Sequence, residues 1–140
     1  MALTNRKDVR LEVSALFEGI TAIAVNLPYP PLSLDGVSPL VYLHDDGVAP
    51  EMLAAASNQF DFYFVLTLCI NRQAYGEAAA EDALDEVWTA VMQAIRDNVT
   101  GVTYTALEVE GRTRPFFALV DGVHYRFEEL SLMARGNISG

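Results

Sequence analysis

Two stretches of the chain repeat their apolar residues every three or four positions, which is the spacing of a helix with one buried face. From Asn5 to Gly19 these residues are Val9, Val13, Leu16 and Phe17. From Glu77 to Asn98 they are Leu84, Val87, Trp88, Val91, Met92 and Ile95. The second stretch also has acidic residues in its first turns and Arg96 in its last, as the helix dipole favours. We therefore predict two amphipathic helices, and we place Trp88 and Met92 in the core.

The strongest strand pattern runs from Phe60 to Asn71 and is apolar at both parities. One face would carry Phe60, Phe62, Phe64, Leu66, Leu68 and Ile70, and the other Tyr63, Val65, Thr67 and Cys69. Both faces of this strand must therefore be covered. We expect helices on the first face, and on the second a neighbouring subunit or the far side of a strongly curved sheet.

Shorter alternating or β-branched runs predict further strands. They cover residues 20–27, 39–44, 102–109, 115–120 and 123–133. In the last of these the apolar parity changes after Phe127, so we expect a bulge or bend near Glu128 and Glu129.

Glycine and proline mark the connections between these elements. Pro28–Ser38 holds three prolines and is predicted to be a loop, Asp45-Asp46-Gly47 ends the second strand, and Asp121-Gly122 has the composition of a type I′ hairpin turn. Val48–Gln59 fits either one or two helical turns or a mobile loop. Glu110–Arg114 fits a longer hairpin turn, and Gly136–Gly140 a frayed end.

These elements predict an α+β fold, with a mainly antiparallel sheet and two helices packed on one face, in the order α-β-β-β-α-β-β-β. A chain of 140 residues with 51% apolar residues suits one domain, which we place at residues 1–140 with a compact core over about 5–133.

The net charge of the chain disfavours some classes of binding partner. Nineteen acidic and nine basic residues give a net charge of -10, which disfavours a surface that binds nucleic acid. A mean hydropathy of +0.20 favours a well-filled core or apolar surface reserved for other subunits. A single cysteine, Cys69, allows no disulfide within the chain and favours a reducing compartment. No apolar run reaches the length of a membrane span, and the amino-terminal segment does not resemble a signal peptide.

The only cluster with catalytic or metal-binding composition is His44-Asp45-Asp46. No second group of His or Cys residues supplies further ligands, so we interpret it as a solvated turn at a strand end. Cys69, in the middle of an apolar strand, is interpreted as a small buried filler. We therefore predict no catalytic residue, no cofactor and no metal.

The candidate functional residues are instead those of an interface. Arg112 and Arg114 flank a predicted hairpin tip in an otherwise acidic chain, where they would reach the carboxylates of a neighbour or simply keep a hairpin end soluble. Together with the second face of the central strand and the acidic turn, they form the predicted subunit or partner interface: Tyr63, Val65, Thr67, Asp45, Asp46, Arg112 and Arg114.

Six segments, in this order, resemble the tail terminator (tail completion) proteins of long-tailed bacteriophages. They are the first helix KDVRLEVSALFEGI, the turn PYPPLSLDG, the strands SPLVYLHDDG and YFVLTLCIN, the helix DALDEVWTAVMQAIRDN and the final DGVHYRFEELSL. The resemblance spans Asn5 to Met133 and concerns pattern and length, because none of these segments is a diagnostic motif.

This resemblance implies a structural virion protein that forms a ring, commonly a hexamer. The ring would dock on the tail tube protein, stop tube polymerisation and present the surface for a head-tail connector or stopper protein. It implies assembly in the host cytoplasm and a place in the virion at the head-tail interface. DNA would pass through the ring without specific binding, because copies at -10 each present an acidic channel. The segments 28–38, 48–59 and 110–114 would contact tube and connector.

Two other functions remain open at this stage. One is another neck or tail component, such as a head-tail joining protein or a tube subunit. The other is a small α+β enzyme or ligand-binding domain that uses His44, Asp45 and Asp46, which predicts a pocket near that segment.

Overall fold

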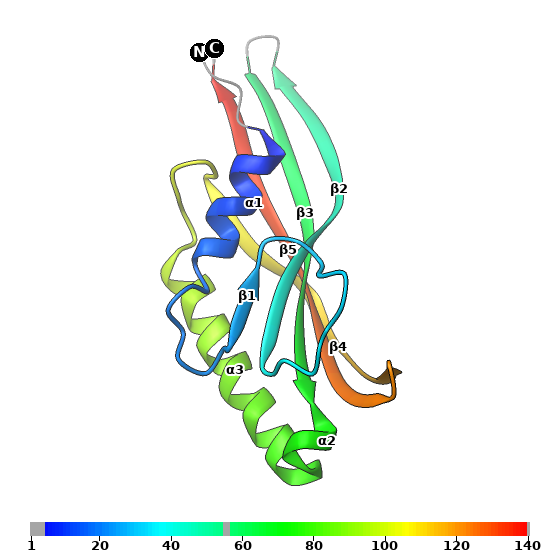
Figure 1. The fold of residues 1–140 in the computed structure, drawn as a ribbon. Coiled ribbons are helices and arrows are strands. Elements are labelled where there is room, and N and C mark those ends of the chain that lie inside the picture. Colours follow the sequence, from blue (N-terminus) through cyan, green and yellow to red (C-terminus); the bar gives the residue numbers. More distant parts are fainter. Residues whose placement is uncertain (1–4, 55–56, 140) are drawn as a thin grey trace.

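A five-stranded sheet forms the centre of the molecule, and two helices lie across one of its faces (Figure 1). The structure is a computed structural model that describes residues 5–54 and 57–139, with the backbone path alone at 49–54, 57–59 and 137–139. The elements in chain order are α1 (Arg6–Ala15), β1 (Val25–Leu27), β2 (Leu40–Ala54), β3 (Ser57–Asn71), α2 (Arg72–Tyr75), α3 (Glu77–Asp97), β4 (Ala106–Val120) and β5 (Val123–Ser139).

The strands lie side by side in the order β1-β2-β3-β5-β4. β1 pairs with β2 in parallel, and the other three pairs are antiparallel. The predicted α+β class and the mainly antiparallel sheet are therefore confirmed. The element order differs in two respects, because a short third helix, α2, precedes α3 and because the last three predicted strands are two long ones.

Local signals explain where the helices begin. The side chain of Asn5 accepts a hydrogen bond from the backbone N–H of Asp8 at 2.9 Å, which caps α1. Asn71 caps α2 in the same way, through the N–H of Ala74 at 3.0 Å. Gly76, with a φ of 84°, then separates α2 from α3 in a backbone conformation that glycine adopts readily.

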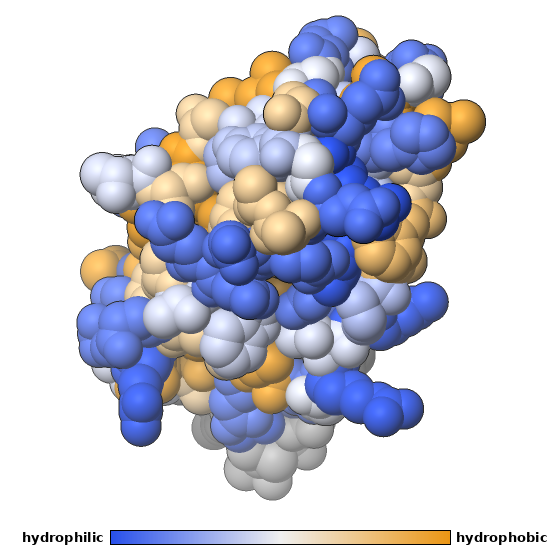
Figure 2. All heavy atoms as spheres, turned by 90° about the horizontal axis from the view of Figure 1, so that it is seen from below, coloured by the Kyte–Doolittle hydropathy of each residue, from blue (hydrophilic) through white to orange (hydrophobic). Residues whose placement is uncertain are grey.

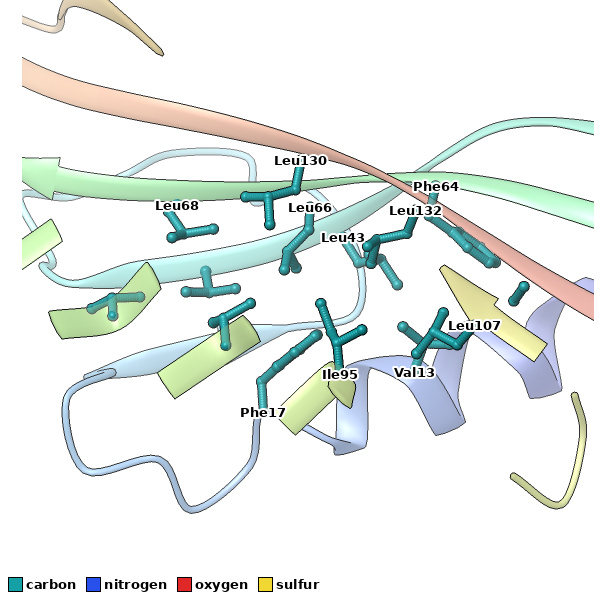
Figure 3. Close-up of a cluster of buried hydrophobic side chains, with 14 of the residues drawn as sticks. Val13, Phe17, Leu43, Phe64, Leu66, Leu68, Ile95, Leu107, Leu130 and Leu132 are labelled. Carbon is teal, nitrogen blue, oxygen red and sulfur yellow. The ribbon is translucent and has the colours of Figure 1, made fainter. Parts of the chain in front are cut away.

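The main core lies between the helices and the first face of the sheet (Figure 3). Val13 and Phe17 from the α1 region and Ile95 from α3 meet a sheet face made largely of Leu43, Phe64, Leu66, Leu68, Leu130 and Leu132. The predicted stripes therefore bury the expected residues, except Leu16, Trp88 and Met92, which are not fully buried. Trp88 is 37% exposed and Met92 is only partly buried at the margin of this core, because both lie on the flank of α3 and not on its buried centre line.

A second, smaller cluster covers part of the opposite sheet face. Leu40, Cys69, Tyr125 and Phe127 are buried there against Leu27 and Leu34. The phenol oxygen of Tyr125 accepts a hydrogen bond from the N–H of Gly36 at 3.0 Å, which fixes the proline-rich loop over this end of the sheet. Part of the face that we assigned to a neighbouring subunit is thus covered by the chain's own loop.

The two clusters on opposite faces of the sheet also explain the change of apolar parity in the last strand. β5 pairs with β3 without a register shift from Tyr125 to Ser139, so β5 has no bulge near Glu128 and Glu129, and the register shift opposite them lies in β4. Tyr125 and Phe127 belong to the second-face cluster, whereas Leu130 and Leu132 belong to the main core. The parity changes because the strand is buried on different faces at its two ends.

Two segments predicted as turns are bulges inside long strands. At Asp45-Asp46-Gly47 the register between β2 and β3 shifts and both strands continue, so 48–59 is neither helix nor loop where it is described. At Glu110–Arg114 the register between β4 and β5 shifts within one strand. Gly47 and Gly111 have φ values of 110° and 65°, which suit a bulge as well as a turn.

The remaining boundaries follow from pairing. The Asp121-Gly122 hairpin is confirmed, because both residues have positive φ as a type I′ turn requires. β1 starts only at Val25, where pairing with Leu40 begins, and residues 20–24 lie outside it. β5 continues to Ser139, opposite Ser57, past the point where we expected the chain to fray.

Candidate assembly surface

The predicted interface residues of β3 have different environments. Thr67 is 1% exposed and buried within the subunit, so its assignment to an interface is wrong. Tyr63 and Val65 are partly exposed on the same face, beyond the end that the proline-rich loop covers. Their cross-strand neighbours on β5 are Met133 and Ser131. This half of the second face remains available to a partner.

Asp45 is bound within its own subunit. One of its carboxylate oxygens lies 3.1 Å from a guanidinium nitrogen of Arg10 and 3.5 Å from Arg6, both on α1. Two cations therefore neutralise this carboxylate and attach α1 to β2. The same ion pairs explain why an acidic segment continues as a strand, since the charge of Asp45 has partners on the helix that packs above it.

Asp46 is the exposed member of the acidic pair. It lies in the bulge of β2 and makes no ion pair with any residue that the structure describes. β1 pairs only with Leu40, Val41 and Tyr42, so the outer edge of β2 from Leu43 onward has no strand beside it in the described chain. Asp46 therefore lies on an unpaired sheet edge.

Arg112 and Arg114 lie on the opposite edge of the sheet, in the bulge of β4 and not at a hairpin tip. The side chain of Arg114 is 81% exposed, with a guanidinium nitrogen 4.0 Å from Glu129. Arg112 is exposed and makes no ion pair within the described residues. The structure thus separates the predicted acidic and basic interface residues onto the two edges of one sheet.

Exposed apolar side chains continue along β4 past its bulge. Phe117 is 59% exposed and Leu119 is 62% exposed. The guanidinium carbons of Arg72 and Arg126 lie 4.8 and 5.3 Å from the centre of the Phe117 ring, a cation-π arrangement that holds the ring in place. The two adjacent phenylalanines were the available signal in the sequence, because neighbouring strand residues face opposite sides of a sheet, and both Phe116 and Phe117 are exposed.

A hollow of about 470 Å³ lies beside α3. It is lined by Trp88, Thr89, Met92, Gln93, Ile95 and Arg96. Figure 2 views the molecule from the end that carries α2 and the β4–β5 hairpin, where hydrophilic residues dominate and apolar residues occur in small separate groups.

The His44-Asp45-Asp46 segment does not form a chemical cluster. His44 pairs with Val65 and Asp45 with Phe64, so the two side chains point to opposite faces of the sheet. In the part of the chain that the structure describes, no group of three or more His, Cys, Asp or Glu residues is placed to hold a metal ion. Burial raises the pKa of Cys69 to about 12, so this thiol stays protonated at neutral pH. None of the described helices has the length and apolar character needed to cross a membrane.

Comparison with known proteins identifies a shared fold. No protein-family model and no curated protein matches the sequence. Among solved structures, a chain of the virion of the native gene transfer agent (GTA) particle is similar, with a TM-score of 0.57 and 22% sequence identity. The alignment covers 98% of this chain and 96% of that chain. At this level of identity the similarity establishes that the two chains share a fold over nearly their whole lengths.

Proposed function

From this shared fold we propose that the protein is a structural virion component and, more specifically, a tail terminator. In this role, copies of the chain form a ring that caps the tail tube, stops its polymerisation and presents the surface that joins tail to head. The observation that carries the proposal is the full-length similarity to a chain of a virion particle, in which almost no segment of either chain is left over.

The distribution of exposed groups supports an assembling subunit. Two sheet edges lack a partner strand in the described chain, and one of them carries exposed apolar side chains such as Phe117 and Leu119. Unpaired, partly apolar edges favour association with another chain. In a ring, both the unpaired strand edges and the exposed apolar side chains would be covered by neighbouring subunits.

The net charge supports a channel that DNA traverses. A ring of copies that each carry -10 repels phosphate groups, so DNA in the lumen would not adhere to the wall. The same charge opposes association of the copies, so the contacts between them must place opposite charges or apolar surface together.

Two measurements test this proposal. Light scattering behind size exclusion should give the mass of a closed ring. The resemblance to tail terminator proteins implies about six subunits. Addition of the protein to polymerising tube protein should shorten the tubes and place density at one tube end in negative-stain images. Open filaments of the protein alone would instead identify a tube subunit. A monomer that neither shortens nor binds tubes would contradict the proposal.

A further inference from the structure

The two unpaired edges of the sheet have matching strand directions. Each neighbouring pair in the series β2, β3, β5 and β4 is antiparallel, so β4 runs opposite to β2. A second copy that is rotated about a ring axis parallel to the strands keeps its strand directions. Its β2 therefore meets β4 of the first copy in an antiparallel arrangement, which suits β-sheet hydrogen bonding without any turn or crossover.

Opposite charges lie at the two bulges. β4 carries exposed Arg112 and Arg114 at its bulge, preceded by exposed Glu108 and Glu110. Arg114 already has Glu129 of its own chain at 4.0 Å, so Arg112 is the cation there without an ion pair among the described residues.

β2 carries exposed Asp46 at its own bulge. Asp45 is already neutralised by Arg6 and Arg10, which leaves Asp46 as the carboxylate at this bulge that is free for a neighbour. The chain has only nine basic residues, and two of them lie exposed and close together on the β4 edge.

We propose that β4 of one copy adds to the outer edge of β2 in the next copy, with Arg112 and Arg114 against Asp46 of that copy. This inference rests on the proposed ring and names its subunit contact. The contact extends one sheet from copy to copy, because each copy uses one edge as donor and the other as acceptor. Such a head-to-tail contact produces a closed ring when the rotation between copies closes.

A two-fold contact between two β4 strands is the competing arrangement. Antiparallel pairing of β4 with itself centred on Thr113 places Arg112 of each copy opposite Arg114 of the other, and like charges at an interface cost free energy. Pairing centred on Gly111 instead places Glu110 opposite Arg112, which is attractive. Cross-linking of single-cysteine variants therefore decides between the two-fold and the head-to-tail contact.

Paired cysteines on the two edges test the geometry. The variant that combines Arg112→Cys with Asp46→Cys is treated with a flexible bismaleimide and separated on a denaturing gel, and Arg114→Cys with Asp46→Cys covers a second register. Cys69 is buried and stays in place. We expect a ladder of covalent multimers that ends at the ring size. Single variants should stay monomeric, and a mixture of the two single variants should stop at dimers.

A matched control uses an exposed residue away from both edges. Glu86 is exposed on α3, which packs on β3 in the middle of the sheet, so the pair Glu86→Cys with Asp46→Cys should give no ladder. Dimers from Arg112→Cys alone would show the two-fold contact and overturn the proposal. A wild-type ring whose paired variants give no ladder would overturn the proposed contact and leave the ring intact.

Charge reversal gives a test that does not depend on register. Changing both Arg112 and Arg114 to Glu should weaken ring formation by about tenfold or more at low salt, because repulsion replaces attraction. Adding Asp46→Arg to the same chain should restore the ring. An unchanged ring after the Glu substitutions would overturn the proposal, whereas a wild-type protein that stays monomeric on tube ends would contradict the ring itself.

Discussion

At the scale of single residues, Glu12 joins two parts of the chain that are far apart in sequence. Its carboxylate, on α1, accepts hydrogen bonds from the backbone N–H groups of Val102 at 2.8 Å and Thr103 at 2.7 Å, and from the Thr103 hydroxyl. Burial alone would raise the pKa of this carboxyl group, but the hydrogen bonds together outweigh burial and lower it below 4.5. Glu12 thus attaches α1 to the segment between α3 and β4.

The variant Glu12→Gln should be less stable than the wild type by about 1–2 kcal/mol at pH 7, because it loses hydrogen bonds to a charged acceptor. A lowered pKa in the folded state means that the stabilisation is present above the ordinary value of 4.5 and is lost as the pH falls through the lowered value. Urea unfolding from pH 7 to pH 3 should therefore show the two proteins converging at the acid end. A difference that does not change with pH would show that the charge of Glu12 is not involved.

Cys69 should be chemically inert in the folded protein. Its thiol is buried, and its pKa of about 12 leaves almost no thiolate at pH 8. We expect maleimide labelling to be negligible in buffer and complete in denaturant, as measured by intact mass. Rapid labelling in buffer would contradict the burial of this strand and would require a Cys69→Ala background for the cross-linking experiment.

At the scale of elements, β3 and β4 have opposite surroundings. β3 lies between two long strands and buries six consecutive residues near its end, including Leu66, Leu68 and Ile70. β4 has β5 on one side only and carries Phe117 and Leu119 in exposed positions. β3 therefore contributes mainly to folding, and β4 presents side chains that are free to contribute to assembly.

Truncation of one leucine on each strand should separate these contributions. Leu66→Ala should lower the free energy of unfolding by about 2–5 kcal/mol, because it leaves a cavity in the core. Leu119→Ala should change it by no more than about 0.5 kcal/mol, since the side chain is mostly exposed. An equal loss of folding stability in both variants would contradict this division.

At the scale of the whole molecule, the unpaired sheet edges predict where backbone protection changes on assembly. The outward N–H groups of β4 have no partner strand in the described chain and should exchange quickly in dissociated subunits. Hydrogen exchange measured by mass spectrometry should show slower exchange of 106–115 in the ring, because these residues face the part of β2 that β1 leaves unpaired. β3 serves as the internal control, because it is paired on both sides in either state. Unchanged exchange across β4 would place the subunit contact elsewhere.

The sequence by itself determined the elements whose signals are local. The buried stripes of α1 and α3, the two-faced apolar pattern of β3 and the Asp121-Gly122 hairpin all follow from helix period, strand alternation and the φ values that one turn requires. The same reasoning identified Tyr63, Val65, Asp46, Arg112 and Arg114 as exposed or partly exposed residues.

The tertiary structure decided which segments continue and which surfaces remain free. A glycine beside charged residues suits a bulge or a turn equally well, and only pairing with β3 and β5 shows that β2 and β4 run on through Gly47 and Gly111. Likewise Thr67 is buried between its cross-strand neighbours Tyr42 on β2 and Glu129 on β5, which are distant in sequence. The order of strands then places Asp46 on one edge and Arg112 on the other. Strand order and coverage are contacts between distant residues, which a local pattern does not encode.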